Sequence, residues 1–193
     1  MKISSTVRTI ITFIIIVLLL LIGWTIVKDW AKPTIIKWLE ELKATWREDE
    51  TPWCATFVAH CLQTAGLKRG TVNSRVKWDG KSKSPAGYYP FNWYGALDYS
   101  REGGTKLDKP AYGCVAVKSR VGGGHVCFVV GKDKATGKLV CLGGNQSNMV
   151  CYALYNESDF EAFMWYGQTS NPAQHRYDLP ILSNVKATGV TES

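Results

Sequence analysis

The sequence lacks the patterns that mark several common functional classes. It has three histidines, no Cys-x-x-Cys pair and no His-x-x-x-His pair, so a structural zinc site is poorly supported. Its formal net charge is +7, but no long block of lysine and arginine is present, which favours a solvated basic face over a nucleic-acid-binding arm. No internal repeat is detectable. These absences predict a chain without a metal, another cofactor or a nucleic-acid partner, and they leave its oligomeric state open.

What is present is the composition of a folded protein. Of the 193 residues, 46% are hydrophobic and 20% are charged, which is neither the composition of a disordered chain nor that of a protein with many membrane spans. The length suits one domain with a real core. Thr9–Val27 is apolar and uncharged, and as a helix it would be about 28 Å long, close to the thickness of the hydrocarbon core of a bilayer. The segment predicts an uncleaved transmembrane anchor.

The six cysteines do not predict a disulfide framework. Cys54 and Cys61 lie seven residues apart on a predicted helix, about 10 Å along its axis, which is too far for a disulfide. Cys127, Cys141 and Cys151 lie in apolar strand patterns, where a free thiol packs as a small hydrophobic side chain.

Periodicity divides the rest of the chain. Apolar residues at helical spacing predict an amphipathic helix over 34–48. A second helix is predicted with Thr51 at its N-cap, Pro52 at its first position and its end at Gly66. Short runs rich in β-branched residues predict a small antiparallel sheet over 114–118, 125–131, 138–142 and 149–154. The predicted division is a tail (1–8), an anchor (9–27), a juxtamembrane helix (28–48), one folded domain (49–167) and a polar, extended or mobile C-terminal tail (168–193).

Three residue types suit nucleophilic catalysis. Cys54 lies in the first turn of a predicted helix, where the partial positive charge and free N–H groups lower the pKa of a thiol and can stabilise an oxyanion. His125 follows three glycines and opens a strand, so it is the best-placed of the histidines to act as the base. Asn145 would orient the imidazole if a hairpin sets it opposite His125. Gln146 is either a second polar contact or an ordinary turn residue.

Two further sets of residues are candidates for contacts with a substrate. Trp53 would form one wall of the cleft beside Cys54. Trp53 and Gln146 are also the side chains expected near the oxyanion. Tyr89 and Trp93 belong to the aromatic segment 88–94, which would either line a groove for sugar or peptide or pack over the sheet.

Four motifs in order resemble the CHAP and NlpC-type cysteine hydrolases, including phage-type enzymes that lyse cell walls. They are Thr51-Pro52-Trp53-Cys54-Ala55 with Phe57-Val58, Leu107-x-x-Pro110-x-x-Gly113, Gly124-His125-Val126 with Phe128, and Leu142-Gly143-Gly144-Asn145-Gln146-Ser147. The resemblance implies an α+β, papain-like domain, with the nucleophile at a helix N-terminus that packs on a small antiparallel sheet. It also implies peptidoglycan as the substrate, cleaved at an amide bond by Cys54, His125 and Asn145.

The expected function is therefore that of an endolysin-like or wall-penetrating amidase or endopeptidase. An antibacterial effector or a host wall-remodelling amidase would use the same chemistry. A non-catalytic, membrane-anchored wall-binding module is the alternative of a different class. The expected localisation follows from this function: a single-pass membrane protein whose domain faces the cell wall on the periplasmic side of the inner membrane, or one held in a host or virion membrane if a phage encodes it.

Overall fold

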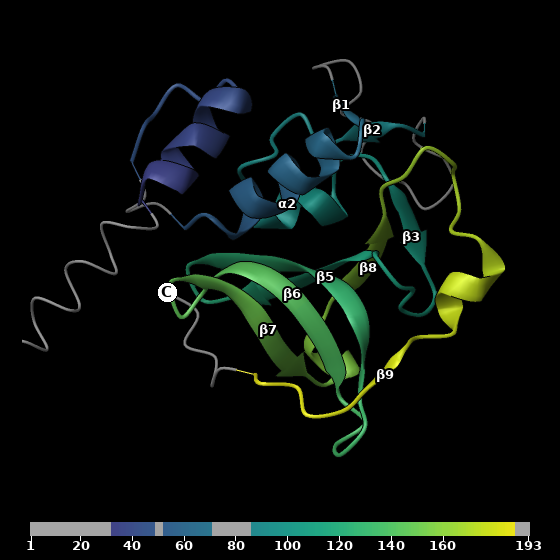
Figure 1. Cartoon of the computed structure of the whole chain (residues 1–193). Coiled ribbons are helices and arrows are strands. Elements are labelled where there is room, and N and C mark those ends of the chain that lie inside the picture. Colours follow the sequence, from purple (N-terminus) through teal and green to yellow (C-terminus); the bar gives the residue numbers. More distant parts are fainter. Residues whose placement is uncertain (1–31, 49–51, 71–85, 188–193) are drawn as a thin grey trace, which may run out of the picture.

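The computed structural model describes residues 32–48, 52–70 and 86–187, in which β-structure dominates (Figure 1). Seven strands form one sheet in the order β3-β8-β4-β5-β6-β7, and the seventh, β9, pairs with β5. The pairs along this order are antiparallel, whereas β9 runs parallel to β5. These strands are β3 (Thr105–Leu107), β4 (Val115–Arg120), β5 (Gly123–Asp133), β6 (Leu139–Gln146), β7 (Met149–Tyr155), β8 (Ala162–Trp165) and β9 (Ile181–Leu182).

The helices of the described residues lie mainly before the sheet in the sequence. Residues 32–41 are helical, and α2 spans Cys54–Thr64. Figure 1 shows both on the same side of the sheet. The smaller elements are β1 (Lys68–Arg69), which pairs in parallel with β2 (Tyr88–Tyr89), and the 3-10 helices η2 (Ala96–Ser100), η3 (Glu157–Asp159) and η4 (Gln174–Tyr177).

The expected fold class, an α+β papain-like domain preceded by one transmembrane helix, is wrong for the described residues. The described chain is mainly β. Among the described residues between α2 and β4 there are only short strands and η2, whereas the β-branched and aromatic residues after residue 113 form most of the sheet. The four predicted strands are confirmed as β4, β5, β6 and β7, each within a few residues of its expected bounds.

The membrane-spanning prediction concerns a part of the chain that the structure does not describe. Thr9–Val27 lies outside the described residues. Within residues 32–48, 52–70 and 86–187, no helix has both the length and the apolar character needed to cross a bilayer. The expected localisation as a single-pass membrane protein is therefore not borne out by the described residues.

Two apolar clusters lie on opposite faces of β5. Val126 belongs to the cluster that contains the buried side of α2, and Cys127 belongs to the cluster behind the sheet. This division follows from the alternation of side chains along a strand. The first cluster joins α2 to β4, β5 and β8, and it places the start of the helix against the strand that carries His125.

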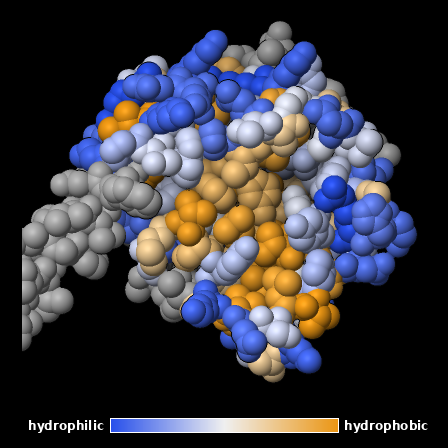
Figure 2. Space-filling view, viewed as in Figure 1, coloured by the Kyte–Doolittle hydropathy of each residue, from blue (hydrophilic) through white to orange (hydrophobic). Residues whose placement is uncertain are grey.

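Apolar side chains also reach the surface. Figure 2 shows apolar residues gathered in the middle of one face, with hydrophilic residues around them. Strand β7 forms one edge of the sheet and exposes Met149, Val150 and Tyr152. Its connection to β6 is a two-residue turn, in which Ser147 and Asn148 adopt the left-handed conformation at φ 51° and 57°.

The segment expected to be an extended or mobile tail is packed as far as it is described. Gly87 donates from its N–H to the carbonyl of Gly167, η4 follows, and β9 then adds to β5 through the register Lys132↔Ile181. The sequence of this segment has no apolar period because only short pieces of it contact the sheet. Backbone hydrogen bonds and the partly buried side chains of Tyr177 and Leu179 attach it to the rest of the fold.

Candidate active site

Cys54 lies in the first turn of α2, as predicted, but it is the first helical residue, so the helix begins two residues later than expected. Trp53 is the N-cap residue and provides no side-chain cap. Pro52 precedes it, and Thr51, the expected capping residue, lies outside the described residues. The first turn of the helix is attached from the side, because the Tyr99 hydroxyl donates a hydrogen bond to the Ala55 carbonyl at 3.2 Å. The N-terminus of α2 is thus held by packing rather than by a capping side chain.

The sulfur of Cys54 lies among backbone N–H groups. Hydrogen bonds with the backbone of Val126 and Ala55 act on the thiol, together with the charge of Arg120. Burial raises the pKa of the thiol above its ordinary value, and these donors and the guanidinium act in the opposite direction. The thiol is 2% exposed. The thiol is therefore neutral in the resting protein, and the groups around it are ones that stabilise negative charge.

The contact with Val126 occurs where the pairing of β5 with β6 has ended. That pairing runs from Lys132↔Leu139 to Phe128↔Leu142. Val126 lies beyond it, and its backbone is hydrogen-bonded to Cys54. The candidate nucleophile therefore contacts β5 one residue away from His125.

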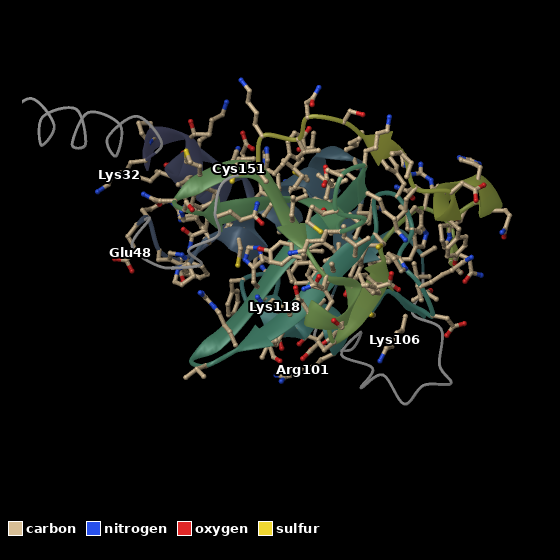
Figure 3. All side chains as sticks on the ribbon, turned by 90° about the horizontal axis from the view of Figure 1, so that it is seen from below. Lys32, Glu48, Arg101, Lys106, Lys118 and Cys151 are labelled. Carbon is tan, nitrogen blue, oxygen red and sulfur yellow. The ribbon has the colours of Figure 1, made fainter. Side chains whose placement is uncertain are left out.

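His125 is buried and contacts residues of β6 and β7. Its ring lies 6.3 Å from that of Tyr155, centroid to centroid, and its Nε2 lies 3.3 Å from Gln146 Oε1. Lys118 is its partner on β4, with Nζ at 5.3 Å from the centre of the Tyr155 ring. Lys118 and Cys151, which are labelled in Figure 3, lie on β4 and β7, on either side of the two strands that carry His125 and Gln146.

The side chain of Gln146 determines which nitrogen of His125 carries the proton. Gln146 Nε2 donates to the carbonyl oxygens of Cys151 at 2.6 Å and Gly143 at 3.3 Å. Its Oε1 therefore faces the Tyr155 hydroxyl, which donates at 3.1 Å, and the His125 ring. An amide oxygen only accepts, so His125 donates from Nε2. In the neutral ring the basic lone pair is then on Nδ1.

Asn145 is placed differently from Gln146. It is buried at 6% exposure and adopts the left-handed conformation at φ 56°. Continuing the β5–β6 register by three residues would set it level with His125, as the sequence reasoning assumed, but the pairing ends before that point. The ladder between β6 and β7 is also irregular between Gly143 and Gln146. This irregularity is what turns the Gln146 side chain toward the imidazole.

The two glycines before Asn145 permit close packing at the site. A Cβ atom on Gly144 would lie 2.6 Å from Phe57 Cβ and 2.7 Å from Trp53 Cζ3. A Cβ atom on Gly143 would lie 2.9 Å from the Gln146 side chain. Gly144 thus lets the start of α2 approach β6, and Gly143 leaves room for the amide that contacts His125.

The aromatic candidates are core residues. Trp53 is buried, and its Nε1 has no hydrogen-bond partner among the described residues. Tyr89 is 4% exposed and donates to Gln63, and Trp93 is 1% exposed and stacks on Trp46 at 5.7 Å. Packing over the sheet, which was one of the two predicted roles, accounts for Tyr89 and Trp93.

The other histidines lie away from this site. His60 stacks on Trp38 at 5.1 Å and lies 3.2 Å from the Glu41 carboxylate, on the outer side of α2. His175 belongs to η4. Among residues 32–48, 52–70 and 86–187, no three side chains of the metal-binding types are grouped so as to hold an ion.

Sequence reasoning missed Tyr155, Tyr99 and the N–H group of Val126. Tyr155 holds Gln146, Tyr99 holds the first turn of α2, and Val126 contacts the thiol. All three act through contacts between residues far apart in the chain. The aromatic character of β7 was visible in the sequence, but the partner of its last tyrosine was not.

Comparisons with family models, with curated proteins and with solved structures find no significant match to this chain.

Proposed function

We propose that this protein is a cysteine hydrolase that cleaves amide bonds in the peptide part of peptidoglycan. The observation that carries the proposal is the arrangement around β5. A thiol at the start of α2 lies against the backbone of Val126, and the preceding residue, His125, is held by the Gln146 amide. A nucleophile at a helix N-terminus, a histidine and an amide that orients it are the parts needed for acyl transfer.

The reaction takes place in two steps. The Cys54 sulfur attacks the amide carbonyl carbon, and its proton passes to the imidazole of His125. Backbone N–H groups at the start of α2 stabilise the oxyanion, as fixed donors do in acyl transfer. The imidazolium then protonates the leaving amine, the C–N bond breaks, and an acyl thioester remains. Water, deprotonated by His125, hydrolyses the thioester and regenerates the thiol.

The electrostatics of Cys54 favour proton transfer during attack over a stable thiolate in the resting enzyme. Burial raises the pKa of the thiol, so at neutral pH the proton is still on sulfur when the substrate binds. A base is therefore required in the first step. His125 fits this role because it is the histidine next to the Val126 contact of Cys54, and the Gln146 amide oxygen, 3.3 Å from its Nε2, orients the ring.

The substrate class rests on the four motifs that resemble CHAP and NlpC-type hydrolases. The glycines of these motifs have physical reasons in this chain: Gly144 admits Trp53 and Phe57, and Gly124 admits Leu97. The net charge of +7 also suits a polymer layer that carries anionic groups. A peptide amide within that layer is the substrate we propose.

The test is mass spectrometry of purified peptidoglycan after incubation with the full chain. The wild type should release fragments with new amine and carboxyl termini, and Cys54→Ala should release none. Cys61→Ala is the matched control, because Cys61 is a second cysteine of α2, two turns further on. Lysis by Cys54→Ala at the wild-type rate would refute the nucleophile. A wild type that binds peptidoglycan without cleaving it would support the wall-binding alternative instead.

The base is tested in the same assay with paired histidine variants. His125→Gln should lower the rate by at least about 100-fold, the usual contribution of a general acid–base group. His60→Gln should stay within about threefold of the wild type, since His60 contacts Trp38 and Glu41 rather than β5. Equal losses in both variants would contradict the assignment of His125.

A further inference from the structure

A large cavity lies at the opposite end of α2 from Cys54. Its volume is about 590 Å³, which is within the range of pockets that bind small molecules. Leu62 of α2, Phe128 of β5 and Trp165 of β8 supply apolar surface to it. Cys61 also lines it, seven residues or about 10 Å along the helix axis from Cys54. The cavity is thus separate from the candidate active site.

Arg176 is the one formally charged residue among those that line this cavity. Arg176 and His175 of η4 line it, and none of the residues that line it is acidic. The Arg176 guanidinium lies over the Trp165 ring at 5.3 Å, and one of its nitrogens donates to the Tyr112 carbonyl at 3.3 Å. These two contacts fix the plane of the guanidinium and leave several of its five N–H groups for a ligand.

Backbone acceptors near the cavity are already used. The carbonyls of Cys61, Leu62 and Gln63 accept from Ala65, Leu67 and Gly66, and the Gly66 carbonyl accepts from Gln168. The end of α2 therefore offers a bound molecule few free acceptors. A ligand that brings its own acceptors, together with apolar surface, fits this cavity best.

We propose that the cavity binds a carboxylate carried on an apolar or aromatic body. The carboxylate pairs with Arg176, and the body lies against Trp165, Phe128 and Leu62. Arginine suits this role because its planar fork matches the two oxygens of a carboxylate. The site needs neither Cys54 nor His125, so the proposal stands independently of the hydrolase function.

Cys61 provides a local readout in the unmodified full chain. The probes are 4-phenylbutyrate and its neutral analogue 4-phenylbutyramide, and the measurement is the rate at which iodoacetamide alkylates Cys61, followed by peptide mass spectrometry at pH 9. Burial raises the pKa of the Cys61 thiol to about 11, so a mildly alkaline buffer makes alkylation measurable. Cys151, which is half-buried on β7, is the internal reference.

The carboxylate probe should protect Cys61 at a concentration at least tenfold lower than the amide, and neither should protect Cys151. Arg176→Gln should weaken protection by the carboxylate about tenfold and leave that by the amide unchanged. Arg176→Lys should retain part of the effect, and Lys134→Gln, an exposed cation elsewhere, should have none. Circular dichroism of each variant confirms that it is folded. Equal protection by both probes, no protection by either at 10 mM, or protection insensitive to Arg176→Gln would overturn the proposal.

Discussion

At the scale of single residues, the amide of Gln146 decides how the histidine is presented. Each of its polar atoms has two partners: Nε2 donates to Cys151 and Gly143, and Oε1 accepts from Tyr155 and His125. A fully bonded buried amide is rigid, because turning it would leave four groups unpaired. Gln146 is therefore a positioning residue, and it takes the role that the sequence assigned to Asn145.

Variants at these two neighbours separate their roles. Gln146→Ala should lower kcat on peptidoglycan by about 100-fold with little change in KM, because the imidazole loses the acceptor that fixes its tautomer. Asn145→Gly should stay within about threefold, since glycine retains the left-handed conformation at φ 56°. Steady-state kinetics on soluble peptidoglycan fragments provide the measurement. A large loss in Asn145→Gly with normal kcat in Gln146→Ala would restore Asn145 as the orienting residue.

At the scale of elements, the contact between α2 and β6 brings the thiol to the sheet. No side-chain cap anchors the N-terminus of α2, so its position depends on the Tyr99 hydrogen bond and on close packing over Gly144. The close approach places Trp53 and Phe57 against the backbone of β6. Any side chain at residue 144 must therefore push the two elements apart.

Gly144→Ala should destabilise the protein by about 1–3 kcal/mol, the usual cost of overpacking. It should also lower hydrolysis by more than the loss of folded protein explains, because the clash at 2.6 Å displaces the start of α2. Urea unfolding and activity at a temperature where both proteins are folded provide the two measurements. Gly137→Ala is the control: it has φ 70° but no neighbour within 4 Å, so it should cost about 1 kcal/mol and leave activity intact. Similar activity in both variants would argue against this role of the contact.

At the scale of the whole molecule, the buried thiols make stability depend on alkaline pH. Cys114 and Cys127 lie in the cluster behind the sheet, and burial raises the pKa of both thiols, that of Cys114 from 9.0 to about 12. In the unfolded chain such thiols ionise near their ordinary value of 9.0. Between pH 9 and about pH 12, these thiols lose their protons in the unfolded chain but keep them in the native protein. Stability is therefore complete below pH 9 and declines as pH rises toward 12.

The urea midpoint should be lower at pH 10.5 than at pH 8, measured under reducing conditions by tryptophan fluorescence. Cys114→Ala should reduce this difference, because one of the thiols that ionise only after unfolding is removed. A variant at Cys151, which lies on the edge strand β7 outside this cluster, should show the wild-type difference. An equal or higher midpoint at pH 10.5 in the wild type would contradict this account.

Local patterns in the sequence were enough to determine several elements of this protein. Cys54 starts a helix because a proline and an apolar stripe follow each other there, and four runs of β-branched residues form β4 to β7. These features depend on the backbone preferences of the residues and on apolar side chains that recur along one face of each element. The same patterns also singled out a cysteine, a histidine and two amides as candidate site residues.

Only the tertiary structure decided the fold class, the packing of residues 168–187 and the choice between Asn145 and Gln146. The number of strands in the sheet depends on pairings between distant segments, such as β9 with β5. The amide that reaches His125 depends on where the β5–β6 pairing ends and on the irregularity of β6. Because side chains alternate between the two faces of a strand, a shift of one residue in β6 turns Gln146 instead of Asn145 toward the histidine. No local residue preference specifies that shift.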